Sequence, residues 1–198
     1  MIVHISCREQ LIELVEEITP TAEKLMAIFW PGPLTIVMKK SKIVPDVITG
    51  GLDTVAIRMP SHPLAMELIR LSGVPVAAPS ANISGKPSPT SERHVIEDLK
   101  GRVDYILLGG DTEVGLESTV LDISGTKAQI LRPGVITYDD IFNVIGELSY
   151  DPHLIDENST PKSPGMKYKH YSPEAEVIIV KGNKKSVKIQ EMIDAVSY

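Results

Sequence analysis

The sequence contains a single cysteine, Cys7, among its 198 residues. One cysteine cannot form a disulfide within the chain, whereas small proteins of oxidising compartments often carry several. The N-terminal residues also lack the basic segment and the apolar core of a secretory signal. These absences lead us to expect a cytoplasmic protein.

Long apolar runs and an excess of positive charge are missing as well. No stretch approaches the roughly 20 apolar residues that span a bilayer, so we expect no membrane partner. The chain carries 20 Lys and Arg against 26 Asp and Glu, a formal net charge of −6. That charge is unsuited to tight binding of nucleic acid phosphates. Only a local basic cluster at Lys162, Lys167, Lys169 and His170 is compatible with weak RNA binding.

Three chemical signatures are absent. The sequence has no Cys or His cluster with metal-ligand spacing, no GxxxxGK[ST] nucleotide loop, and no Ser/His/Asp set that spacing alone supports. We therefore assign no metal ligand. A nucleotide, if bound, would be held by hydroxyl, amide and arginine groups.

What the sequence does contain is a chain able to form a packed core, with 42% hydrophobic and 23% charged residues. Alternating strand-like and helix-like periodicities predict a mixed α/β fold. Strands are expected at 1–5, 34–38, 54–59, 76–78, 103–108, 118–123, 128–131 and 175–180. Helices are expected at 8–18, 21–29, 63–71, 91–99, 138–145 and 187–196.

The periodic pattern stops between residues 149 and 174, a stretch rich in Pro, Ser, Lys and Asp. Such a composition is typical of a linker. We therefore divide the chain into a domain at 1–148, a linker at 149–174 and a fragment of a second α/β domain at 175–198. The last strand and helix cannot bury a core alone.

The segment 76–89 is the stretch around which the chain is organised. An apolar run bracketed by Pro75 and Pro79 predicts a buried strand, and a polar loop containing Ser80, Ser84 and Ser88 follows it. Hydroxyls and exposed backbone N–H groups suit a phosphate or another anion. The alternative is an ordinary polar surface turn.

Two arginines end apolar strands. Arg58 and Arg132 each need an anionic partner if buried, either a protein carboxylate or a ligand carboxylate or phosphate held bidentately. Arg132, in a turn, could instead pair with a surface acid. His4, among apolar neighbours, is more typical of a core residue than of a ligand. Ser118, near a strand start, could be an ordinary polar strand end.

Five motifs occur in order along the chain, followed by a sixth in the linker. They are FWPGPLT at 29–35, VAIRMP at 55–60, PSANISG at 79–85, ESTV at 117–120, RPG at 132–134, and SPGMKYKHYSP at 163–173. Together they closely resemble the YrdC-like threonylcarbamoyl-adenylate synthase family, in its longer, two-domain branch.

The resemblance implies a twisted mixed β-sheet with helices around a large concave cavity. It implies a nucleotidyltransferase that makes threonylcarbamoyl-AMP and pyrophosphate from L-threonine, bicarbonate and ATP, with Mg²⁺ on the phosphates. A downstream tRNA-modifying complex would use the product to form threonylcarbamoyladenosine beside the anticodon. A carbamoyl-transfer relative is disfavoured by the linker motif.

Site residues follow from the same resemblance. L-Threonine would be held by His4, Arg58, Ala78 and Ser118, of which Arg58 and Ser118 are the catalytic candidates. ATP would be held by Thr54, Ser80, Ser88, Arg132 and Tyr171. Tyr171, in the linker, would close over the nucleotide as a lid.

The sequence departs from the family pattern at both ends. The family's opening strand and helix and its phosphate-binding Lys-x-Arg motif would precede Met1, and the C-terminal domain would continue beyond Tyr198. We therefore expect a truncated chain. The alternative function is a non-catalytic relative that binds threonine, nucleotide or RNA.

Overall fold

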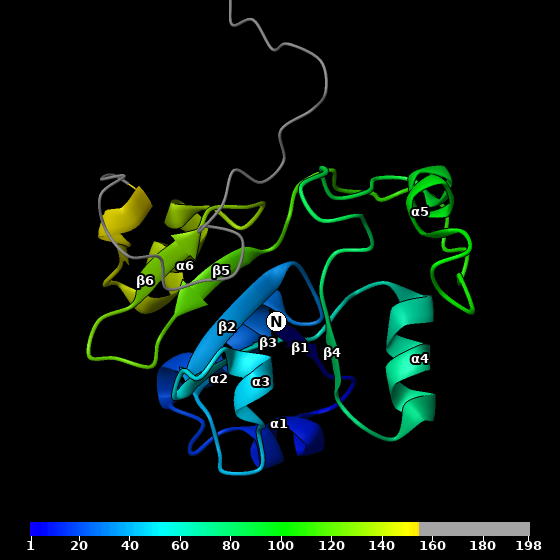
Figure 1. Cartoon of the computed structure of the whole chain (residues 1–198). Helices are drawn as coiled ribbons and strands as arrows, with labels where there is room; N and C mark the ends of the chain where they lie inside the picture. The colour runs from blue at the N-terminus through cyan, green and yellow to red at the C-terminus, as the bar shows by residue number, and fades with distance from the viewer. Residues whose placement is uncertain (155–198) are drawn as a thin grey trace, which may run out of the picture.

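The computed structural model describes residues 1–154 of the chain. Within these residues, seven strands form one twisted sheet in the order β4-β1-β3-β2-β5-β6-β7 (Figure 1). The strands are β1 (Ile2–His4), β2 (Leu34–Lys39), β3 (Thr54–Arg58), β4 (Val76–Ala78), β5 (Thr119–Asp122), β6 (Gln129–Arg132) and β7 (Ser149–Tyr150). The helices are α1 (Arg8–Leu14), α2 (Pro20–Phe29), α3 (Asp46–Thr49), α4 (Pro63–Ser72), α5 (Glu92–Leu99) and α6 (Tyr138–Ile145), with a 3₁₀ turn at Pro152–Leu154.

The sheet is mixed. β1 pairs with β3 in parallel, β2 with β5 in parallel, and β6 with β7 in parallel. The other three pairings are antiparallel. The expected α/β class and its twisted mixed sheet are confirmed.

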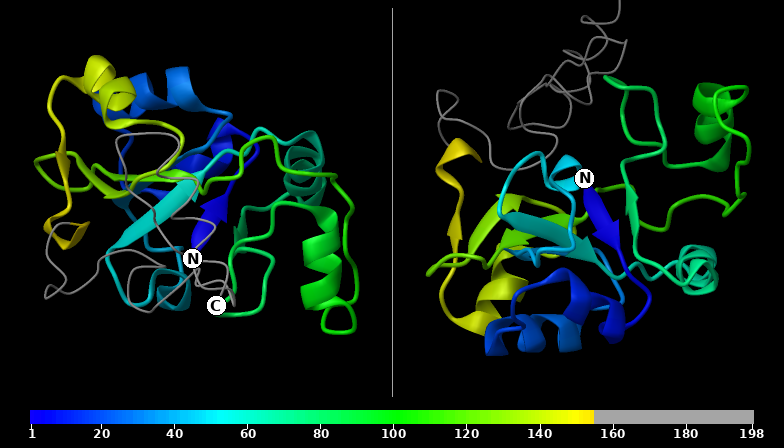
Figure 2. Two further views of the ribbon diagram at one scale, coloured as in Figure 1. Left: turned by 90° about the horizontal axis from the view of Figure 1, so that it is seen from above. Right: turned by 60° about the horizontal axis from the view of Figure 1, so that its bottom comes forward.

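One face of the sheet carries the main core. Side chains alternate between the faces of a strand, so Val3, Ile36 and Ile57 all point to the same side. They pack against helical residues such as Leu11, Leu25 and Ile141. Figure 2 shows α1 and α2 together beneath this face. Thr19 begins α2 by accepting a hydrogen bond from the Ala22 N–H.

The opposite face carries polar residues near the ends of β1 and β3. His4 is the register partner of Arg58 across the parallel pair. On the other side of β1, Ala78 is the partner of Ile2, and alternation places Ile2 on the same face as His4. This face is the floor of the cavity described below.

One expectation about apolar residues is wrong. Residues 103–108 form no ladder with any described strand, and Tyr105 is 92% exposed. A strand-like pattern cannot form a strand without a neighbour to accept its hydrogen bonds. In α4, Leu64, Leu68 and Leu71 are exposed, and the buried residue is Ile69. The helix expected at 63–71 is confirmed as α4.

Smaller differences occur elsewhere. The expected helix at 8–18 ends at Leu14, because Val15 is extended and bridges to Lys40. α3 lies in the connection between β2 and β3. β4 is a half-buried edge strand rather than a buried one. The sheet also continues past the expected boundary at 148, because β7 pairs with β6.

The remaining predicted elements, 175–180 and 187–196, lie outside the described residues, as do the basic cluster and the linker motif. Among residues 1–154, no helix combines the length and the apolar character needed to span a membrane.

Candidate functional site

A cavity of about 610 Å³ opens over the polar face of the sheet. Its floor comes from β1, β3 and β4, and its walls come from the loop 79–90 and the segment 112–118. Seven of the predicted site residues line this one cavity: His4, Arg58, Ala78, Ser80, Ser88, Ser118 and Arg132. A cavity of this size is large enough for a small-molecule ligand.

Arg58 is the cation on the floor. Its Nε donates to the Gly32 carbonyl at 3.0 Å, and within residues 1–154 its guanidinium forms no ion pair. The pKa of Arg58 is lowered first by burial and second by the positive charge of Arg132. An arginine stays protonated at neutral pH regardless. The cavity therefore presents a half-buried positive charge to an incoming anion.

The FWPGPLT motif builds the support for Arg58. Gly32 N–H donates to the Met59 carbonyl at 2.8 Å, which fixes the Gly32 carbonyl beside the end of β3. A Cβ at Gly32 would lie 2.3 Å from the Phe29 carbonyl oxygen, so only glycine fits here. Trp30 Nε1 donates to the Leu34 carbonyl at 2.7 Å and ties the turn to β2.

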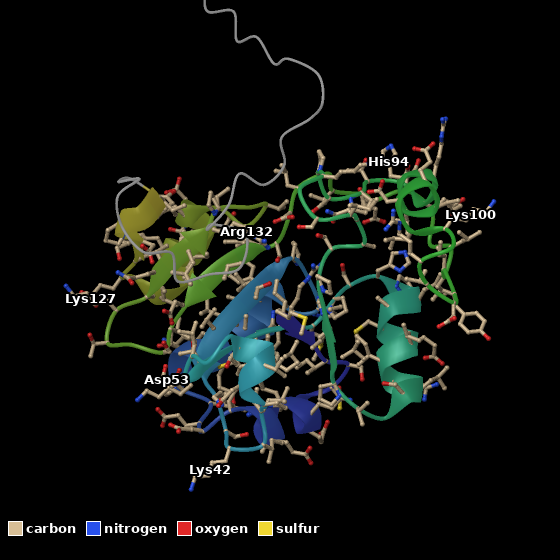
Figure 3. The ribbon with its side chains drawn as sticks, in the orientation of Figure 1. Lys42, Asp53, His94, Lys100, Lys127 and Arg132 are labelled. Carbon is tan, nitrogen blue, oxygen red and sulfur yellow. The ribbon has the colours of Figure 1, made fainter. Side chains whose placement is uncertain are left out.

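Arg132, at the end of β6, is the second cation. Its Nε and Nη2 donate to the Ser118 carbonyl at 3.0 and 2.9 Å, and Nη2 also reaches Ser118 Oγ at 3.0 Å. Its Nη1 pairs with Glu117 Oε2 at 2.5 Å. Figure 3 shows Arg132 near the middle of the molecule, whereas Lys42 and Lys127 lie at its periphery. The guanidinium is thus fixed on two sides.

Ser118, directly before β5, contacts the neighbouring strand β2. Its Oγ lies 2.8 Å from Oγ1 of Thr35 on β2, and both residues are buried. The RPG motif allows this approach, because a Cβ on Gly134 would lie 2.5 Å from the Glu117 carbonyl oxygen and 2.6 Å from the Thr119 nitrogen. Gly134 is therefore required for close packing of the turn on β5.

The serine-rich loop is held at two places. Ser88 Oγ donates to Glu117 Oε1 at 2.5 Å. Lys86 Nζ pairs with Asp98 Oδ1 at 2.7 Å, and that hydrogen bond is the main reason that the pKa of Asp98 is lowered. Asn82 Nδ2 donates to the Lys86 carbonyl at 3.0 Å, while the buried Oδ1 of Asn82 has no partner among the described residues.

His4 is a neutral group beside Arg58. Burial lowers its pKa from 6.5, and the charge of Arg58 lowers it further. Backbone hydrogen bonds with Val76 and Ile2 partly offset this lowering, and at neutral pH the imidazole is uncharged. It does not compete with Arg58 for an anion.

Two predicted site residues are not brought to the cavity by the described structure. Thr54 begins β3, pairs with Lys39 and does not line the cavity. Arg58 ends the same strand, so roughly 13 Å separates the two Cα atoms at 3.3 Å per residue. The assignment of Thr54 to ATP stays a prediction. Tyr171 lies outside the described residues.

Sequence reasoning missed three residues of the site. Asn82 and Glu117 line the cavity, and Thr35 supports Ser118 from below. All three lie inside motifs that the sequence displays, so the motifs were the available signal. Within residues 1–154, no group of three or more His, Cys, Asp or Glu side chains could hold a metal ion.

Comparison with known families matches most of the chain. Residues 1–134 match the family model Sua5_yciO_yrdC, described as Telomere recombination. Residues 136–197 match the model described as Threonylcarbamoyl-AMP synthase, C-terminal domain.

Individual relatives are similar over nearly the whole chain. A protein named Threonylcarbamoyl-AMP synthase from Pyrococcus abyssi is 54% identical over 196 residues, covering 98% of this chain and 58% of the relative. One of the same name from Bacillus subtilis is 50% identical over 194 residues, covering 98% and 56%. The crystal structure of P. abyssi Sua5 complexed with L-threonine matches with a TM-score of 0.91 and 53% identity, covering 98% of this chain and 58% of that one. This chain thus spans a little over half the length of these relatives.

Proposed function

The chain belongs to the Sua5/YciO/YrdC family, and on that premise we propose that its cavity binds L-threonine, bicarbonate and ATP and joins them into threonylcarbamoyl-AMP with release of pyrophosphate. The observation that carries the proposal is that Arg58 and Arg132 line one cavity together with the serine-rich loop. Two cations and a set of small donors suit an amino acid carboxylate and a polyphosphate.

L-Threonine is assigned to the floor. The Arg58 guanidinium, which has no ion pair within residues 1–154, matches a carboxylate with its planar fork. Ala78 leaves room beside it, and Ser118 and neutral His4 supply polar atoms for the amine and the hydroxyl. The P. abyssi relative was crystallised with L-threonine.

ATP is assigned to the walls, with its phosphates near Ser80, Ser88 and Arg132. Tyr171 as a lid over the nucleotide rests on the family resemblance alone. The division into a catalytic domain, a linker and a second-domain fragment rests on the composition of residues 149–174 and stays a proposal.

The reaction is a nucleotidyl transfer that needs positioning more than it needs a covalent nucleophile. The threonine amine attacks bicarbonate, giving a carbamate and water. A carbamate oxygen then attacks the α-phosphorus of ATP, the bond to the β-phosphate oxygen breaks, and pyrophosphate leaves. Arg58 and Arg132 bring anions together and stabilise the developing charge, and Ser118 holds Arg132 in place.

Magnesium enters this proposal with the nucleotide. Among the described residues, Glu117 is the only carboxylate that lines the cavity, and it is already bound by Ser88 and Arg132. One carboxylate does not make a Mg²⁺ site by itself, whereas ATP phosphates bind Mg²⁺ in solution and in most ATP sites. We therefore treat MgATP as the substrate and assign no resident metal.

The product would be consumed by an enzyme complex that transfers the threonylcarbamoyl group to an adenosine of tRNA. Weak RNA binding and a cytoplasmic location stay predictions from the sequence.

The test supplies the chain with MgATP, L-threonine and bicarbonate, and measures pyrophosphate and threonylcarbamoyl-AMP by enzymatic assay and mass spectrometry. We expect both products, and neither when threonine is omitted. Threonine binding by calorimetry without turnover would support the non-catalytic alternative. A chain that binds neither threonine nor ATP would contradict the proposal.

A further inference from the structure

The cavity holds two arginines whose partners differ. Arg132 is paired with the carboxylate of Glu117, whereas Arg58 forms no ion pair within residues 1–154. One site for an anion is therefore open, while the other already contains a carboxylate of the protein itself.

The Glu117 carboxylate also reaches the serine-rich loop. Its Oε1 accepts from Ser88 Oγ at 2.5 Å, and its Oε2 pairs with Arg132 Nη1 at 2.5 Å. Ser88 and Arg132 are the same two groups that the proposed function assigns to ATP. Each of them holds, in this structure, an oxygen of an acid.

We propose that Glu117 is an internal anion that occupies the phosphate-binding groups of the cavity and must be displaced when a polyphosphate binds. The proposal rests on the proposed function, because it concerns the ATP half of that site. It makes Glu117 a residue that weakens ATP binding and keeps the loop closed onto β5 until ATP arrives.

The geometry permits such an exchange. The Nε and Nη2 atoms of Arg132 stay anchored on Ser118, so the guanidinium keeps its place while Nη1 changes partner. Glu117 and Arg132 side chains are 25% and 19% exposed, so the carboxylate has access to solvent when it leaves. A carboxylate and a phosphate at adjacent positions would otherwise repel each other in a partly buried site.

The test compares Glu117→Gln with the wild-type chain, using inorganic tripolyphosphate as the probe and calorimetry as the measurement. The amide has nearly the same shape but no charge to hold Arg132. We expect tripolyphosphate to bind roughly tenfold more tightly to Glu117→Gln, from the loss of one repulsive charge at short range. The affinity for L-threonine should not change, because Arg58 is not involved.

Glu97→Gln is the matched control. It removes one negative charge from an exposed pair with Arg93 on α5, away from the cavity lining, so it should bind tripolyphosphate like the wild type. If Glu117 served only to position Arg132, Glu117→Gln would bind the probe more weakly. Weaker or unchanged affinity, or no binding to either protein, would overturn the proposal.

A second measurement does not depend on the variant. In a structure of the wild-type chain with tripolyphosphate, the Glu117 carboxylate should lie beyond 4.0 Å from the Arg132 guanidinium, outside ion-pair distance. An intact pair in that complex would contradict the displacement. Threonine binding is measured on the same samples, so failure of the proposed function is seen separately.

Discussion

Arg58 and Arg132 face the same cavity, and the pKa of Arg58 is lowered first by burial and then by the charge of Arg132. Two guanidiniums that share one cavity destabilise each other unless an anion lies between or beside them. For Arg132, that anion is the carboxylate of Glu117. For Arg58, the anion would come from a bound ligand. A substitution of Arg58 therefore tests the threonine site directly.

Arg58→Lys should lose most L-threonine binding. Lysine keeps the charge but not the planar fork that meets both oxygens of a carboxylate, so the affinity should fall roughly tenfold to a hundredfold, as for one or two charged hydrogen bonds. Calorimetry with L-threonine measures it. Arg70→Lys, in an exposed pair with Glu67 on α4, is the control and should bind normally. Equal affinities in both variants would remove Arg58 from the threonine site.

Thr35→Val should destabilise the fold. The two side chains have similar volumes, but valine leaves the buried Ser118 Oγ without its Thr35 partner at 2.8 Å. The free energy of unfolding should fall by about 1–2 kcal/mol, the usual cost of an unsatisfied buried hydroxyl. Urea unfolding measures it, with Thr126→Val in an exposed loop as the control. A loss no larger than that of the control would mean that this contact does not stabilise the sheet.

The strands of this fold were predictable where neighbouring strands also came from strong patterns. β2 and β3 are both rich in β-branched and apolar residues. β3 alternates buried and half-buried residues, whereas β2, in the middle of the sheet, is buried from Leu34 to Met38. Residues 103–108 have the same kind of pattern, yet they pair with no described strand, and most of them are exposed. A local sequence pattern shows that a segment prefers the strand conformation, but it does not show whether a neighbouring strand is present to pair with it.

The sequence motifs identified most residues of the site, but they did not predict which of these residues contact one another. Arg58, Ser88 and Arg132 were identified from the sequence, and they do meet in one cavity. Nothing in the sequence says that Glu117 lies between Ser88 and Arg132, because that contact depends on how the loop folds back over β5. Thr54 and Arg58 lie at opposite ends of the five-residue strand β3, so only Arg58 reaches the described cavity lining, and the assignment of Thr54 to ATP stays a prediction.

Gly134→Ala should disrupt the packing of the RPG turn on β5. A Cβ there would lie 2.5 Å from the Glu117 carbonyl oxygen and 2.6 Å from the Thr119 nitrogen, which are backbone atoms that cannot move aside cheaply. We expect a loss of about 2–4 kcal/mol in the free energy of unfolding, at the upper end of overpacking effects. Thermal and urea unfolding measure it.

Gly125→Ala is the matched control for that substitution. A Cβ at Gly125 meets nothing within 4 Å, and its backbone has no positive φ. It should leave stability unchanged or slightly raise it, through a less flexible unfolded chain. Equal free energies of unfolding for the two alanine variants would show that the RPG motif does not need glycine at position 134 for close packing on β5.

The free energy of unfolding should decrease as the pH is lowered, because His4 becomes protonated more readily in the unfolded chain. Its pKa in the folded chain is lowered from 6.5, by burial first and by Arg58 second, so the unfolded chain binds its proton more readily. The sign follows from linkage: the contribution of His4 is fully present above pH 6.5 and is lost progressively as the pH falls below that value. Urea unfolding at pH 7.5 and at pH 5.5, about one unit to either side of the reference pKa, measures the difference.

His4→Gln should lose less stability than the wild type between these two pH values, because glutamine does not titrate. His94→Gln, on an exposed position of α5, should behave like the wild type. Equal pH dependence in the wild type and in His4→Gln would show that His4 is not held neutral by its surroundings.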